Sequence, residues 1–502
     1  MNIKQAKEQI RNAIKAYFTK DENGDYMLPA HQQRPLFLMG PPGIGKTAVM
    51  EQVAAEMGVG LLSYSMTHHT RQSALGLPFI VHKSYQGGKI ECDVSEYTMS
   101  EIIASVYDLM EETGIREGIL FLDEINCVSE TLAPVMLQFL QYKVFGKHTV
   151  PEGWIVVTAG NPPEYNNSVR EFDIVTWDRL KRVDIEPDFD VWKEYAANVG
   201  VHPAVLTYLE IRKDDFYKVG STVDGKTFVT ARGWEDLSRM IRLYEKNGIR
   251  VDGLLMGQYL QDEKIARGFA QYYDLFQKYR SDYQVDSILE GHADESIRER
   301  ARKAKFDERL SLIGLMMDVV RAEAQQTMNR NKAILGLMET LKKFRLNIKS
   351  GEPRDVFAGI LAEKESELAA GKKSGALGGN DLAVLRMLMG MMREEEALIA
   401  GAKDAASAFK ALKTDYDSRV EAFKKDSALP GKKMNNMFLF AESAFGDGQE
   451  ILIIATELTA TPACSAYIAR FGCSEYFRHN KDLLLYERGN KISELLDGLS
   501  LN

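Results

Sequence analysis

The spacing of hydrophobic and polar positions changes along the chain and divides it into two parts. In the first part, short apolar runs of strand length alternate with amphipathic stretches of helical spacing. This alternation predicts an α/β fold with a parallel five-stranded sheet between helices, whose ligand chemistry lies at the C-terminal ends of the strands. The predicted strands cover residues 36–39, 61–66, 118–122, 154–158 and 183–186.

From residue 189 onward, apolar residues recur every three or four positions, which predicts helices. Short helices come first and are typical of a small helical lid. They cover residues 190–198, 203–212, 231–247 and 254–279.

Two long amphipathic patterns follow, over residues 310–335 and 382–423. Their apolar faces would pair as a long antiparallel helical hairpin. A short helix at residues 353–369 and a flexible Gly-rich turn at residues 371–379 separate them, and we expect a compact helical end at residues 435–499.

A polar connection at residues 282–294 marks a domain boundary. The predicted domains are an α/β domain over residues 1–188, a helical lid over 189–285 and an all-α C-terminal domain over 286–502.

The most informative motif directly follows the first predicted strand. Gly40, Gly45, Lys46 and Thr47 fit the pattern G-x-x-x-x-G-K-[ST], and a helical pattern follows them. Glycines reach backbone angles closed to other residues, so successive N–H groups can surround phosphates at a helix N-terminus. We expect Lys46 to neutralise the β- and γ-phosphates of ATP and the Thr47 hydroxyl to bind Mg²⁺. The predicted loop comprises Gly40, Pro41, Pro42, Gly43, Ile44, Gly45, Lys46, Thr47 and Ala48.

Two further predicted strands carry polar side chains to the same edge of the sheet. Asp123 and Glu124 end the strand at residues 118–122, and Asn161 follows the strand at residues 154–158. We expect Asp123 to complete the Mg²⁺ shell, Glu124 to polarise the attacking water and Asn161 to orient it. The alternative for the acidic pair is that carboxylates end many strands simply because water meets the sheet there.

An arginine before the fifth predicted strand completes the candidate chemistry. Arg179 cannot easily reach the nucleotide of its own subunit, but it could act on a neighbour's as an arginine finger. The alternative is a surface ion pair between Asp178 and Arg179.

Four runs then carry a resemblance to a known family. GPPGIGKT at residues 40–47, LFLDEIN at 120–126, GNPP at 160–163 and the Asp178-Arg179 turn stand in this order and spacing. Together they resemble the AAA+ ATPases of the P-loop superfamily, and more closely the MoxR-like branch. The resemblance covers roughly residues 30–245 and does not reach the C-terminal half.

The resemblance implies a role for each matching residue. It places Lys46 and Thr47 in Walker A and Asp123 and Glu124 in Walker B, with Asn161 as sensor 1, Arg179 as the finger and Arg232 as sensor 2. One departure concerns the finger: the usual Leu-Asp-Arg-Phe is Trp-Asp-Arg-Leu here, and Arg182 lies close enough to compete for the role.

Two candidate β-hairpins interrupt the α/β pattern, at residues 79–90 and 142–153. MoxR-like proteins are similar in carrying a hairpin insert at the first position. In a ring, the aromatic residues Phe79, Tyr85 and Phe145 would grip a partner or a polypeptide. The alternative is that they only pin their own hairpins.

Composition narrows the function classes. The 502 residues include 63 Lys and Arg against 72 Asp and Glu, and this net charge of −9 argues weakly against general binding to nucleic acids. No apolar run has the length of a membrane span, and the start lacks a signal-peptide pattern, so we expect a cytoplasmic protein without membrane insertion. The four scattered cysteines are typical of free thiols rather than of zinc ligands or disulfides.

These observations predict an ATP hydrolase that uses Mg²⁺. The resemblance implies a homo-oligomeric ring, a hexamer, that remodels or matures a protein partner, with a von Willebrand A-domain protein as the expected partner. Two alternatives stay open: a nucleic-acid motor or loader, and a nucleotide-gated scaffold with slow turnover.

Overall fold

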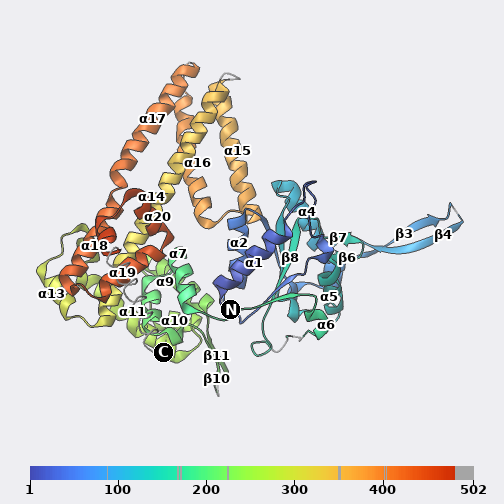
Figure 1. The fold of residues 1–502 in the computed structure, drawn as a ribbon, viewed down its shortest axis with the longest axis horizontal. Coiled ribbons are helices and arrows are strands. Elements are labelled where there is room, and N and C mark those ends of the chain that lie inside the picture. The colour runs from blue at the N-terminus through green and yellow to red at the C-terminus, as the bar shows by residue number, and fades with distance from the viewer. Residues whose placement is uncertain are drawn as a thin grey trace, which may run out of the picture. The chain divides into compact units, whose positions relative to one another are not determined.

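The computed structural model describes residues 1–87, 89–166, 169, 172–222, 225–348, 352–400, 402 and 404–480 (Figure 1). Its elements gather into two compact units. The first unit holds Met1–Val191 together with Ala362–Arg386, and the second holds Trp192–Leu361 and the described residues from Met387 onward.

A parallel five-stranded sheet forms the centre of the first unit, in the order β2-β5-β8-β1-β9. Each pairing is parallel. The predicted sheet is therefore confirmed, although the last strand begins two residues earlier than predicted. The strands are β1 (Leu36–Met39), β2 (Gly60–Ser65), β5 (Gly118–Asp123), β8 (Trp154–Gly160) and β9 (Lys181–Asp184).

Helices cover this sheet because its strands are apolar on both faces. Phe37, Leu120 and Val156 contribute to a buried core that includes residues of α4 and α5. Leu36 and Leu38 alternate with Phe37 along β1, so they face the opposite side of the sheet, and both are fully buried. The helices of this unit are α1 (Ile3–Tyr17), α2 (Lys46–Met57), α3 (Arg71–Leu75), α4 (Glu101–Thr113), α5 (Ala133–Tyr142) and α6 (Ile174–Trp177).

A Gly-rich turn from far along the chain also packs within the first unit. It joins α15 (Pro353–Ser374) to α16 (Gly379–Ile399). Lys373 forms an ion pair with Glu112 of α4, and the Cα atoms of Gly375 and Gly378 face Leu61 of β2 and Ala55 of α2. Residues 371–374 belong to α15, so the predicted flexible turn is shorter than expected and is held against the α/β core.

Both predicted hairpins form in the first unit. In the first, β3 (Pro78–Tyr85) pairs with β4 (Ile90–Tyr97) and projects from the sheet (Figure 1). Phe79 and Tyr85 are 41% and 45% exposed. The expected Gly-Gly turn includes Gly88, which lies outside the described residues.

The second hairpin corrects one expectation. It pairs β6 (Val144–Phe145) with β7 (His148–Thr149). Phe145 is fully buried and stacks on Phe139 of α5 with the ring centroids 4.1 Å apart. Phe145 therefore pins its own hairpin and is unable to grip a partner.

The second unit begins with the predicted lid helices and adds a hairpin that the sequence did not predict, β10 (Lys218–Thr222) with β11 (Gly225–Val229). The predicted helix at residues 254–279 is two helices, because Asp262 caps a new one by accepting from the backbone N–H groups of Lys264 and Ile265. The helices are α7 (Phe189–Val199), α8 (Pro203–Ile211), α9 (Ala231–Lys246), α10 (Gly253–Tyr259) and α11 (Glu263–Tyr283).

The C-terminal part is helical, as predicted, with one break that was missed. The pattern at residues 382–423 is divided between α16 and α17, because the Asp404 side chain caps α17 through the Ser407 backbone N–H. A helix, α12, also lies inside the expected polar connection. The remaining helices are α12 (Val285–Glu290), α13 (Glu295–Lys303), α14 (Phe306–Asn347), α17 (Ala405–Asp426), α18 (Leu429–Phe445), α19 (Gln449–Ala460) and α20 (Pro462–Phe471).

The helices α14 and α17 pair in antiparallel fashion. Arg330 of α14 forms an ion pair of 2.8 Å with Asp426 at the end of α17. Further along α14, Arg345 lies over the ring of Phe409, near the start of α17. The predicted antiparallel pairing of long helices thus holds for these two. The predicted helical end includes residues 481–499, which lie outside the described residues.

Within the described part of the chain, no single helix has the length and apolar character needed to cross a membrane. The helices α19 and α20, which meet at an angle of 90°, satisfy these requirements only when they are counted together as one span.

A buried hydrogen-bond network ties α8, α9 and α11 together. Glu245 accepts hydrogen bonds from Tyr273 at 2.9 Å and from Gln277 at 2.6 Å, and it lies 3.3 Å from Nε2 of His202. Nδ1 of His202 accepts from the Ala204 N–H, so Nε2 carries the proton and donates to Glu245. Burial alone would raise the pKa of Glu245, but these bonds outweigh it and lower the pKa to about 2.

This lowered pKa predicts acid sensitivity of the three helices that the network joins. The unfolded Glu245 carboxylate binds a proton near its ordinary pKa of 4.5, whereas the folded one stays ionised to about pH 2. Its stabilising effect is therefore complete above pH 4.5 and is lost as the pH falls toward 2, at a cost of about 1 to 3 kcal/mol. We expect Glu245→Gln to flatten this part of the curve of unfolding midpoint against pH. Glu263→Gln, which changes an exposed carboxylate, should leave this part of the curve unchanged. Equal curves of unfolding midpoint against pH for the two variants would contradict the prediction.

Candidate active site

The Gly-rich loop lies between the C-terminal end of β1 and the start of α2. Gly43 and Gly45 have φ values of 74° and 94°, a region that side chains rarely allow, and Gly45 caps α2. Gly40 is closely packed, since a Cβ atom there would lie 2.8 Å from the Ile185 carbonyl oxygen. The backbone therefore has the conformation for which the motif requires glycine.

Lys46 is the central charge of this loop. Its side chain is buried, and Nζ donates to the carbonyl oxygens of Gly40 at 2.8 Å and Pro41 at 2.9 Å. It also donates to Oδ1 of Asn161 at 2.9 Å. The structure thus brings Lys46 and Asn161, predicted from separate strands, into direct contact.

The acidic pair lies beside the loop, at the end of β5. The Thr47 hydroxyl donates to Oδ2 of Asp123 at 3.0 Å. A hydroxyl and a carboxylate in contact are oxygen ligands that suit Mg²⁺, and the cationic Lys46 with the Gly-rich turn suits a polyphosphate. The residues present therefore fit Mg²⁺ and a nucleoside triphosphate.

Glu124 has a strained backbone and two partners that the sequence analysis missed. It lies in the left-handed region at φ 57°. Its Oε2 atom accepts from Ser65 at 3.0 Å and from Thr67 at 3.2 Å. Ser65 ends β2, where it is in register with Asp123 of β5, and Thr67 follows two residues later. Polar residues at the end of a predicted strand were the signal that could have identified them.

Asn126 is a second residue that the analysis did not single out. It is buried, and its Nδ2 atom donates to the Asn161 carbonyl oxygen at 2.8 Å. Its close approach requires Gly160, because a Cβ atom at that position would lie 2.4 Å from the Asn126 Oδ1 atom. Asn126 and Gly160 together fix the backbone that carries Asn161.

The two candidate finger arginines differ in their contacts. Arg179 is exposed in the turn after α6. Asp178 forms its ion pair, at 4.0 Å, with Arg34. By contrast, Nε of Arg182 lies 2.8 Å from Asp184 and its guanidinium covers the Trp177 ring.

Arg182 also lines a cavity of about 590 Å³ next to the Gly-rich loop of its own chain. The wall includes Gly40, Pro41 and Asn126. Arg182 thus lies beside the Gly-rich loop of its own chain, whereas Arg179 is exposed to solvent. Arg232, the candidate for sensor 2, is exposed at the second position of α9 in the second unit.

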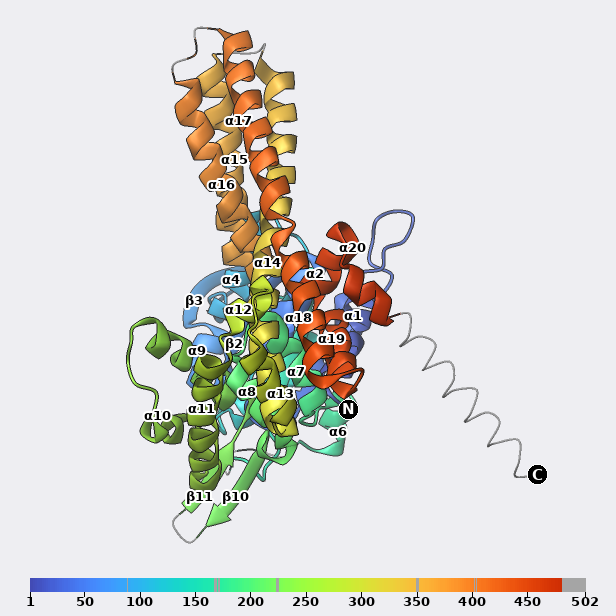
Figure 2. The ribbon, with the colours of Figure 1, turned by 90° about the vertical axis from the view of Figure 1, so that its left-hand side faces the viewer.

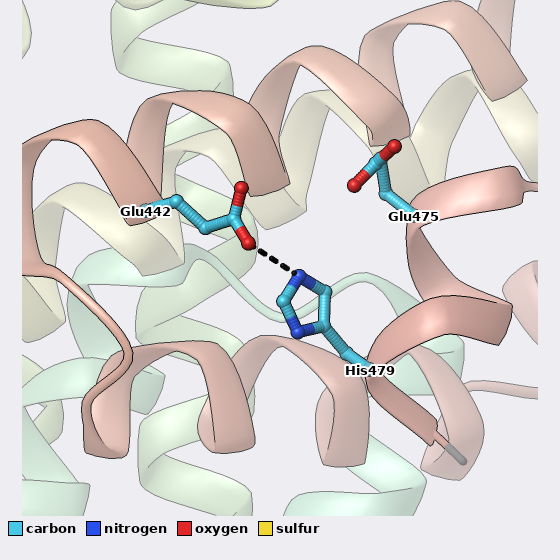
Figure 3. A group of neighbouring side chains, drawn as sticks. All are labelled: Glu442, Glu475 and His479. Atoms are coloured by element: carbon cyan, nitrogen blue, oxygen red, sulfur yellow. Dashed lines mark ion pairs between the residues drawn. The ribbon is translucent and has the colours of Figure 1, made fainter. Parts of the chain in front are cut away.

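A separate group of potential metal ligands lies in the C-terminal helices. Figure 3 shows Glu442 and His479 pointing toward each other, with Glu475 on the opposite side. The Arg478 guanidinium lies 2.5 Å from both carboxylates. Because this arginine already supplies the positive charge, the group is an ion-pair network. All four cysteines are free thiols, and Cys464 and Cys473 are buried.

Comparison with known proteins agrees with this geometry. Residues 36–174 match the family model described as ATPase family associated with various cellular activities (AAA). The matched segment runs from the first residue of β1 to the first residue of α6, and it includes Lys46, the acidic pair and Asn161. No curated protein matches the chain. Residues 36–174 thus form an ATPase domain of the AAA+ type, within the P-loop superfamily.

Proposed function

We propose that this protein hydrolyses ATP in a homo-oligomeric ring and uses the energy to remodel or mature a protein partner. The observation that carries the proposal is the meeting of Lys46, Thr47, Asp123 and Glu124 at one edge of the sheet. Phosphoryl transfer to water requires a cationic side chain, a pair of Mg²⁺ ligands and a further carboxylate that can accept the proton of the water.

Each residue has a distinct role in this proposal. Lys46 holds the β- and γ-phosphates, exchanging its bonds to the Gly40 and Pro41 carbonyls for phosphate oxygens. Thr47 and Asp123 hold Mg²⁺, which when bound neutralises charge on the phosphates. Glu124 accepts the proton of the attacking water, and Asn161, in contact with Lys46, orients that water.

The hydroxyls of Ser65 and Thr67 give Glu124 a resting position. Both donate to Oε2 and so hold this oxygen in place. We propose that Glu124 leaves these hydroxyls when it acts on water. Ser65 and Thr67 are thus positioning residues.

The contacts of the two arginines favour Arg179 as the residue that acts on a neighbouring subunit. Arg182 is held by Asp184 and Trp177 beside its own Gly-rich loop. Arg179 is exposed and can extend to another subunit. Arg232 remains the proposed sensor 2 of the lid.

ATP turnover per subunit at increasing protein concentration tests the ATPase and the ring together. We expect turnover to rise with concentration until the ring is complete, because Arg179 must come from a neighbour. The Lys46→Ala variant, which lacks the phosphate-binding ammonium, is the control and should show no turnover. Constant turnover per subunit at all concentrations, or equal turnover in the control, would contradict the proposal.

We further propose that the protein belongs to the MoxR-like branch and acts with the kind of partner typical of that branch. The branch resemblance suggests a von Willebrand A-domain protein as the partner. Purification of the Glu124→Gln variant with ATP, followed by mass spectrometry, should recover such a protein. Salt-sensitive stimulation of turnover by DNA or RNA would instead favour a nucleic-acid motor.

A further inference from the structure

A second cavity lies in the second unit, far along the chain from the Gly-rich loop. Its walls come from α7, α8, α14 and α19, and α14 packs against both α8 and α19 (Figure 2). About half of the lining residues have apolar side chains, among them Leu206, Ile313 and Met317. Two lining residues of α19, Leu452 and Thr456, are exposed, so the cavity reaches the protein surface.

The cavity has the size of a small organic molecule. Its volume is about 280 Å³. Since a cavity of about 150 Å³ is enough to bind benzene, this one has room for roughly twelve non-hydrogen atoms.

One cation in the wall has an unused hydrogen-bond donor. Arg321 of α14 is only 9% exposed, and its Nε atom has no hydrogen-bond partner among the described residues. A guanidinium does not lose its proton in a protein, so this donor stays charged. A buried charged donor without an acceptor destabilises the folded protein, and a carboxylate that reaches the Arg321 guanidinium from the cavity would remove part of that cost.

The other charged groups at the cavity already satisfy one another. Nζ of Lys193 lies 2.7 Å from Glu210 and 2.6 Å from Glu457. Burial alone would lower the pKa of Lys193, but the two carboxylates outweigh it and the pKa is raised, so Lys193 stays protonated. Lys193 is thus already paired with both glutamates, so among the described cations of this wall it is Arg321 that has a donor left for an added carboxylate.

We propose that this cavity binds a small amphipathic monocarboxylate, with its apolar body among Leu206, Ile313 and Met317 and its carboxylate on Arg321. The apolar walls select a hydrocarbon body, and the buried guanidinium selects a planar anion that can accept two hydrogen bonds. The site joins a helix of the lid to two helices of the C-terminal part, all within the second unit.

Titration calorimetry of the full chain with decanoate, decanol and acetate tests the site. We expect decanoate to bind at a single site, at least about tenfold more tightly than decanol, because only decanoate pairs with Arg321. Acetate lacks the apolar body and should not bind detectably. Equal affinity for decanoate and decanol would overturn the proposal.

Two variants separate the charge from the cavity. Arg321→Leu should reduce decanoate affinity to that of decanol while decanol affinity is retained, and without ligand its unfolding midpoint should not fall, since a buried unpaired charge is removed. Ile453→Trp fills the cavity from α19 and should abolish binding of both ligands. Arg330→Leu removes an arginine of the same helix that lies outside the cavity. It should change neither the affinity for decanoate nor the affinity for decanol.

Unchanged decanoate affinity in Arg321→Leu, or in Ile453→Trp, would show that decanoate binds elsewhere and would overturn the proposal. If Arg321→Leu does not fold, the decanoate preference of the unsubstituted chain and its loss in Ile453→Trp decide the question.

Discussion

Replacing Glu124 with glutamine is expected to reduce ATP turnover by at least about 100-fold while leaving nucleotide affinity nearly unchanged. Glutamine has the size of glutamate and can still accept hydrogen bonds from Ser65 and Thr67. However, it has no negative charge with which to attract the proton of the attacking water. Lys46, Thr47 and Asp123, which would hold the nucleotide and Mg²⁺, are unchanged in this variant.

Phosphate release at saturating ATP and equilibrium binding of a labelled nucleotide measure the two effects separately. Glu111→Gln removes an exposed carboxylate of α4 and should leave both unchanged. If the Glu124→Gln variant hydrolyses ATP at the normal rate, Glu124 is not the catalytic base. If it loses nucleotide affinity instead, Glu124 acts in binding.

Replacing Arg179 with alanine is expected to reduce turnover by about 1,000-fold or more, through loss of a positive charge at the neighbouring subunit's phosphates. The side chain is exposed, so its removal should leave the fold and the unfolding midpoint unchanged. Arg182→Ala is the informative comparison. It removes a guanidinium held by Asp184 beside its own loop and so should act within one subunit.

Mixed rings distinguish these two modes of action. Subunits with Arg179→Ala retain Lys46, and subunits with Lys46→Ala retain Arg179, so a complete site forms where the two meet in the right order. An equimolar mixture should recover about a quarter of the normal turnover, because about that share of ring interfaces has this order. Arg182→Ala mixed with Lys46→Ala should recover none. Absence of recovery in every mixture would exclude catalysis by Arg179 in trans.

The sequence predicted the α/β core because its signals are local. The Gly-rich loop, the strand before it and the helix after it are contiguous, and β5 and β8 are short apolar runs that end in polar residues. Parallel strands then bring Lys46, Asp123 and Asn161 to one edge without further information.

The predictions failed where contacts between distant or neighbouring elements determine the structure. Phe145 looked like an exposed hairpin tip, but its ring stacks on Phe139, a residue of the preceding helix. The apolar pattern predicted one continuous helix over residues 382–423, but a new helix begins after the cap at Asp404. Apolar spacing alone does not reveal a break of a few residues. Ser65 and Thr67 were missed because their role depends on the neighbouring strand, which the local pattern does not identify.

The projecting hairpin of β3 and β4 has a consequence for solubility. In the described part of the chain these strands pair only with each other, so each leaves one row of backbone donors and acceptors open to another molecule. Polar and charged side chains stand along the ribbon, with His82 hydrogen-bonded to Asp93 and Lys83 paired with Glu96. The charges of Lys83, Asp93 and Glu96 disfavour pairing of one ribbon with another, and so they oppose aggregation through these two exposed strands.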